Sequence, residues 1–180
     1  SFLSKFFYIV SNYSRIMLRS SGHLATERPF NNGRFMNFKN AIKTCLKDKY
    51  ANFKGRASRS EFWFFYLFLA IGYAISISTM FISIKLFIGT ILIFSLAMII
   101  PSIAVTVRRL HDINKSGWFI LLPLPFDIME RVLEKSSEGL SLVFLVISLG
   151  LYIYLLVLYC TDGDKKNNRF GKNIYKGKRK

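Results

Sequence analysis

The sequence is poor in the residues from which catalytic and metal sites are built. It contains two cysteines and two histidines among 180 residues, and His23 and His111 lie far apart in the chain. This set offers no zinc-ligand spacing, and no glycine-rich phosphate loop or Ser/His/Asp set with a recognisable local context is present. We therefore expect no metal, no cofactor and no enzyme activity.

Acidic residues are also scarce, at ten against 26 lysines and arginines, although 52% of the chain is hydrophobic. Charged residues are absent from 62–84, 86–107 and 140–160, and about 20 apolar residues are enough to cross the hydrocarbon core of a bilayer. The sequence therefore predicts an all-α integral membrane protein with three strong spans. Lys85 alone separates the first two spans, which predicts a tight hairpin with its turn within 82–89.

A fourth apolar stretch, 118–129, is shorter and contains Pro123, Pro125 and Asp127. If 118–133 crosses the membrane, the basic segments 36–61, 108–115 and 161–180 all fall on one side, with 18 lysines and arginines against three on the other. Basic loops favour the cytoplasm. We therefore predict a four-helix bundle with a short proline-containing third span and both termini in the cytoplasm.

The predicted organisation has four parts. Residues 1–35 form a weakly ordered N-terminal extension, 36–61 an amphipathic segment, 62–160 the transmembrane domain and 161–180 a basic cytoplasmic tail. The amphipathic segment begins with a helix whose apolar stripe faces away from lysines at four-residue spacing. This helix lies either in the membrane interface or against the protein's own loops, and the pattern does not choose between them.

Three polar stretches, 53–63, 108–118 and 168–171, face the predicted cytoplasmic side. Ser58 and Glu61 have the Ser-x-x-Glu spacing of a capping box, so helix capping alone explains both residues. In the functional interpretation, the three stretches form one binding site, since the planar fork of arginine suits phosphate and carboxylate groups. The candidate site residues are Arg56, Arg59, Glu61, Arg108, Arg109, His111, Asp112, Asn168 and Arg169.

Together, these stretches resemble the small bacterial inner-membrane proteins of the YhaH and YhaI type, which are grouped under a domain of unknown function. The resemblance covers residues 36 to about 175 and is carried by FKGRASRSEFW (53–63), RRLHD with SGW (108–112 and 116–118) and NRFG (168–171). It implies a four-helix domain of the cytoplasmic membrane without an established activity. Phe119 departs from the family pattern, which usually has a second tryptophan there.

We expect a binding or scaffold protein of the bacterial inner membrane, whose basic cytoplasmic rim docks anionic lipid headgroups, a membrane-protein partner or a second copy of the chain. Anionic lipid is a simpler partner than nucleic acid, because the basic charge borders membrane spans. The same polar residues could instead form an internal salt-bridge network that ties helix ends together. The alternative function is a subunit of a small transporter or channel, which would need oligomerisation to enclose a hydrated path.

Overall fold

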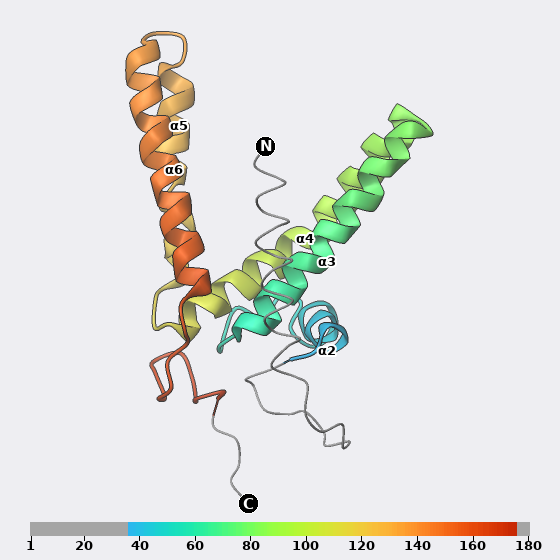
Figure 1. Ribbon diagram of the computed structural model, residues 1–180, viewed down its shortest axis with the longest axis vertical. Coiled ribbons are helices and arrows are strands. Elements are labelled where there is room, and N and C mark those ends of the chain that lie inside the picture. Colours follow the sequence, from blue (N-terminus) through green and yellow to red (C-terminus); the bar gives the residue numbers. More distant parts are fainter. Residues whose placement is uncertain (1–35, 176–180) are drawn as a thin grey trace, which may run out of the picture. The chain divides into compact units, whose positions relative to one another are not determined.

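The computed structural model describes residues 36–175, and their secondary structure is helical apart from one isolated bridge between Asn168 and Gly171 (Figure 1). The predicted extension, 1–35, lies outside the described residues. Three helical segments are long and apolar enough to cross a membrane, which confirms the all-helical class and the three strong spans. The elements are α2 (Phe38–Lys43), the π-helix η1 (Thr44–Asp48), α3 (Arg59–Ser78), the 3-10 helix η2 (Thr79–Phe81), α4 (Ile84–Asp112), the 3-10 helix η3 (Gly117–Leu121), α5 (Leu124–Leu133) and α6 (Glu138–Cys160).

Helices α3 and α4 pack side by side as the predicted hairpin (Figure 1). Gly72 allows the close approach, because a Cβ atom at this position would overlap the ring of Phe94. The turn consists of Ile82 and Ser83, at the start of the predicted 82–89. Helix α3 tightens into η2, and Ser83 is extended (φ −162°, ψ 134°), so α4 begins at once and Lys85 belongs to its first turn.

Pro101 lies inside α4 and has no N–H to bond the carbonyl of Ala97, one turn earlier. The hydroxyl of Tyr50 donates to that carbonyl at 2.5 Å. Tyr50 follows η1 in the chain, so this hydrogen bond fastens the N-terminal segment to the middle of α4. The proline therefore leaves the Ala97 carbonyl free to accept the hydrogen bond that holds the N-terminal segment.

The N-terminal helical segment, α2 with η1, packs on α3. Ala41 and Cys45 are fully buried, whereas Lys39, Lys43 and Lys47 are exposed. Of the two locations that the pattern allowed, the contacts place the apolar stripe against the protein itself. Contact of this segment with a membrane surface stays a prediction.

Helix α5 packs along α6 (Figure 1). The stretch predicted as the third span, 118–133, consists of two short helices, η3 and α5, and not of one continuous helix. Prolines explain the break: Pro123 and Pro125 have no N–H to donate, so they fit the start of α5 and not a helix interior.

Elsewhere along the spans, large apolar side chains point outward. Ile75 is 64% exposed, Ile93 71% and Val146 60%. Exposed apolar area on this scale is unfavourable in water and is the normal surface of a helix in lipid. The buried apolar core is small and comprises Cys45, Ala57, Phe62, Phe65, Leu69 and Val105.

Candidate functional site

Five charged side chains, which we call the charge cluster, are buried where α4 ends and α3 begins: Arg56, Glu61, Arg108, Arg109 and Asp112. Asp112 is held by two of them. Arg109, one turn earlier on α4, donates from Nη1 to Asp112 Oδ2 at 2.6 Å, and Arg56 donates from Nε to Oδ1 at 2.8 Å. All three of these side chains are at most 1% exposed, so the pairing is fully removed from solvent.

The second part of the charge cluster lies toward α2 and α3. Arg108 donates from Nη1 to the Glu61 carboxylate, and the thiol of Cys45 lies 3.9 Å from both side chains. Neighbouring residues on a helix point in different directions, which is why Arg108 and Arg109 need separate carboxylates. The Nε of Arg108 is buried and makes no hydrogen bond within the described residues.

The start of α3 shows how Glu61 becomes available for this pair. Ser58 caps the helix, because its side chain accepts a hydrogen bond from the Glu61 backbone N–H at 3.2 Å. The Glu61 carboxylate does not complete the predicted capping box and binds Arg108 instead. An ion pair with a buried guanidinium is the stronger interaction for a buried carboxylate.

The segment after α6 closes the charge cluster with backbone carbonyls. Arg109 donates to the carbonyls of Tyr159, at 3.1 Å, and Thr161, and Arg56 donates to those of Asp164 and Lys166, the latter at 2.8 Å. These acceptors satisfy the guanidinium donors that the single carboxylate of Asp112 leaves over.

Two further residues, Tyr175 and Gly163, contribute to the packing around the charge cluster, and the sequence analysis did not identify them. Tyr175 donates its hydroxyl to Asp112 Oδ2. A Cβ atom at Gly163 would overlap both Asp112 and Tyr175, so only glycine lets the backbone pass here. The run Thr-Asp-Gly-Asp after the last span was the one available signal for this close approach; nothing in the sequence singled out Tyr175.

His111 lies beside the cluster and not within it. Its ring stacks on Phe170, with centroids 3.8 Å apart and planes at 5°, and its Nδ1 lies 3.2 Å from the carbonyl of Gly55. Asn168 donates from Nδ2 to the His111 carbonyl at 2.8 Å. Asp112 points elsewhere, into its arginine pairs, so the two neighbours do not form an acid–base pair.

The structure thus brings the nine candidate residues close together but gives them different exposure. The five members of the charge cluster are buried and bind one another, and His111 and Asn168 are half-buried. Arg59 and Arg169 remain accessible: Arg59 pairs with the exposed Asp162, and the Arg169 guanidinium lies 4.7 Å from the centroid of the Phe170 ring. Within the described part of the chain, the cluster is an internal network, and its arginines are too deeply buried to present donors to an external phosphate.

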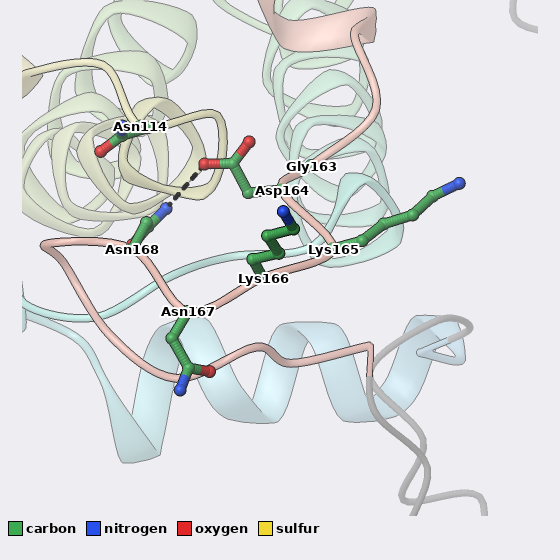
Figure 2. Close-up of a pocket in the computed structure, with 7 residues that line it drawn as sticks. All are labelled: Asn114, Gly163, Asp164, Lys165, Lys166, Asn167 and Asn168. Carbon is green, nitrogen blue, oxygen red and sulfur yellow. Dashed lines mark hydrogen bonds between the residues drawn. The ribbon is translucent and has the colours of Figure 1, made fainter.

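An open pocket of about 530 Å³ borders this network (Figure 2). Asp164 and Asn168 form a hydrogen bond of 3.3 Å on one side of it, and the Lys165 side chain extends away from them. The lining combines backbone, amide side chains, the Asp164 carboxylate and two exposed lysines, so it is polar and carries both signs of charge. Its residues are Asn114, Gly163, Asp164, Lys165, Lys166, Asn167 and Asn168.

Burial changes the acidity of two groups around the cluster. Desolvation, and next the negative charge of Glu61, raises the pKa of the Cys45 thiol to about 12. Desolvation, and next the hydrogen bond to Asp112, raises the pKa of the Tyr175 hydroxyl above its usual value. Both groups are therefore neutral at physiological pH and act as hydrogen-bonding partners, not as nucleophiles.

Three helices are long and apolar enough to cross a membrane, and buried arginines join their ends: α3 and α4 through ion pairs, and the end of α6 through hydrogen bonds to its carbonyls. These features define the class of this chain as a small multi-pass helical membrane protein. The family model described as "Protein of unknown function (DUF805)" matches residues 50–172, and the chain belongs to this family. It is 33% identical over 124 residues to the inner membrane protein YhaI of Escherichia coli K12, covering 68% of this chain and 85% of that protein. The same values hold for YhaI of Escherichia coli O157:H7. No solved structure matches the chain at a significant level.

Proposed function

We propose that this chain is a bacterial inner-membrane binding protein that holds anionic lipid headgroups on exposed basic residues around the charge cluster. The observation that carries the proposal is the burial of the cluster's own arginines. Because Arg56, Arg108 and Arg109 are used internally, their role is to fix the surface on which other residues bind. The accessible cations on this surface come from the segment after α6: Lys165, Lys166, Arg169 and Lys172.

Four crossings support this arrangement. The last residues of α4 and α6 meet at the cluster, since Arg109 bonds the carbonyl of Tyr159 and the Asp164 N–H bonds the carbonyl of Asp112 at 2.9 Å. The 23 residues of α6 place its start about 35 Å away from its end. The chain between α4 and α6 therefore has to travel from one end of α6 to the other.

The short helices η3 and α5 are long enough for most of this path. At a rise of about 2.0 Å per residue in η3 and about 1.5 Å in α5, they span roughly 25 Å together. A hydrocarbon core is about 30 Å thick. Four crossings put the basic segments 36–61, 108–115 and 161–175 on one side, and the positive-inside bias makes that side cytoplasmic.

Retention of anionic lipid tests the proposal. Each exposed lysine or arginine near a headgroup surface contributes about 1 kcal/mol. In native mass spectrometry of the detergent-purified full chain, we expect K165Q/K166Q to reduce phosphatidylglycerol retention roughly 30-fold relative to wild type, since two charges contribute about 2 kcal/mol. The matched control is R131Q/K135Q, which removes the same charge from the other side of the proposed topology and should leave retention within about twofold. Equal losses in both variants would count against a specific surface.

A subunit of a small transporter is the second candidate, and one observation favours it. Asp127 of α5 faces α6 and accepts hydrogen bonds from Ser148 and Tyr152. Ionisable side chains within membrane spans are rare and commonly mark ion or substrate paths. Flux of ions or solutes through the wild-type chain in liposomes, lost in D127N, would favour this candidate over lipid binding.

A further inference from the structure

Asp127 is the acidic side chain that faces the middle of a membrane-spanning helix. Its Oδ1 accepts a hydrogen bond from Ser148 Oγ, and its Oδ2 accepts one from Tyr152 Oη at 2.6 Å. Ser148 is buried between α5 and α6. Each oxygen of the carboxylate therefore accepts a hydrogen bond from a hydroxyl group of the neighbouring helix.

The depth of this site follows from the length of α6. At about 1.5 Å per residue, Ser148 lies about 15 Å from the start of α6 and about 18 Å from its end. If α6 spans the bilayer, Asp127 therefore lies near its midplane. An uncompensated carboxylate there is unfavourable by a few kcal/mol on translocon-based scales.

The groups that could neutralise Asp127 are few. On α5 the nearby cation is Arg131, which forms no ion pair with Asp127 within 4.0 Å, and Glu130 carries the same charge as Asp127. From α6, Tyr152 is the titratable group in contact with it. Within the described residues, the other titratable residues of α6 form no hydrogen bond with Asp127: Glu138, Tyr154, Tyr159 and Cys160.

We propose that Asp127, Ser148 and Tyr152 form a proton-binding site within the membrane. A proton from water joins one oxygen of the Asp127 carboxylate, and the charge of the group changes from −1 to zero. The inference goes beyond lipid binding and concerns other residues, although both proposals rest on α6 spanning the membrane.

The oxygen set favours a proton over a metal ion. The side chains offer one carboxylate and two hydroxyl groups, whereas Ca²⁺ takes six to eight oxygen ligands and Mg²⁺ requires near-ideal octahedral coordination. Within the described residues, no group of three His, Cys, Asp or Glu side chains is placed to hold a metal ion. A proton needs only one oxygen of this set.

The two hydroxyl groups also suit both states of the carboxyl group. Serine and tyrosine hydroxyls can donate and accept hydrogen bonds. When Asp127 is charged, both hydroxyls donate to it, as seen here. When Asp127 is protonated, its own O–H donates to one of them, which rotates its hydrogen away. In both states each oxygen of the carboxyl group therefore keeps a hydrogen bond.

Infrared spectroscopy of the full chain in lipid nanodiscs tests this proposal. We expect a carbonyl band of one protonated carboxyl group that disappears in a single transition as the pH is raised from about 4 to about 9. The band should be absent in D127N and retained in E130Q, the matched carboxylate-to-amide change one turn away. Circular dichroism and gel filtration check that both variants keep the wild-type fold.

A variant of Tyr152 distinguishes a proton-binding site from a purely structural hydrogen bond. In Y152F the carboxylate loses one donor, and we expect the transition to move by about half to one pH unit. A purely structural hydrogen bond would lower stability without moving the transition. A band from Asp127 that is absent or constant at every pH would overturn the proposal. So would a transition at the ordinary aspartate value that Y152F leaves unmoved.

Discussion

Removal of the Asp112 charge is the sharpest test of what the charge cluster does. In D112N the side chain keeps its shape, but Arg56 and Arg109 lose their shared carboxylate while remaining buried. Removing one partner of a buried ion pair typically costs 3–5 kcal/mol, because the remaining charge stays out of water. The carbonyls around both guanidinium groups keep their hydrogen bonds and offset part of this loss, so we expect a loss of about 3 kcal/mol.

Asp162 provides the matched control for this experiment. It forms an ion pair with Arg59, but it is 73% exposed, and surface pairs contribute about 0–1 kcal/mol. D162N makes the same change in net charge. The free energy of unfolding in micelles, followed by tryptophan fluorescence, should therefore fall by at least about 2 kcal/mol more in D112N than in D162N. Similar losses in the two variants would refute the view that buried pairing holds the helix ends together.

Three further predictions address single contacts. Because burial raises the pKa of Cys45 to about 12 against an ordinary 9.0, the neutral thiol's contribution to stability is complete below about pH 9 and is lost as the pH rises toward 12. Iodoacetamide at about pH 8 should spare Cys45 until the chain unfolds, and rapid native labelling seen by mass spectrometry would disprove its burial. Y50F removes the donor to the carbonyl that Pro101 frees and should lower the free energy of unfolding by about 0.5–1.5 kcal/mol. In a P101A background, which restores a helical N–H, Y50F should lower the free energy of unfolding by less. An unchanged loss would show that the contribution of the Tyr50 hydrogen bond does not depend on the proline. G163A should lower the free energy of unfolding by about 1–3 kcal/mol, because it forces a methyl group into the charge cluster. G150A, with open space around it, should change this free energy by less than about 1 kcal/mol. Equal unfolding midpoints in the two variants would argue against close packing at Gly163.

The parts of this fold that depend on local pattern were predictable from the sequence. Charge-free runs gave the three strong spans, because the cost of charge in hydrocarbon acts residue by residue. Ser58 was recognisable as the cap of α3, because capping involves neighbours three positions apart. The turn lies within the predicted range but at its start, at Ile82 and Ser83, since Lys85 marks a charge and not the position where the backbone leaves the helix.

Pairings between distant residues were beyond the reach of such patterns. The Arg108–Glu61 pair joins residues 47 positions apart, and the Tyr175–Asp112 hydrogen bond joins residues 63 apart. Each depends on how α3, α4 and the last segment pack. The proximity of the three polar stretches could be anticipated from charge placement, whereas the burial of their arginines could not, because it depends on carbonyls supplied by residues 159–166.

Burial also separates the composition of the arginine pair at the end of α4 from its role in the structure. Arg108 and Arg109 have the composition of a headgroup-binding pair, but each is 0% exposed and already holds a carboxylate. A guanidinium cannot serve an internal carboxylate and an external phosphate with the same donors. The arginines therefore account for the cohesion of the helix ends, and binding is better sought at the exposed cations after α6. Proton exchange is better sought at Asp127, whose carboxylate forms no ion pair among residues 36–175.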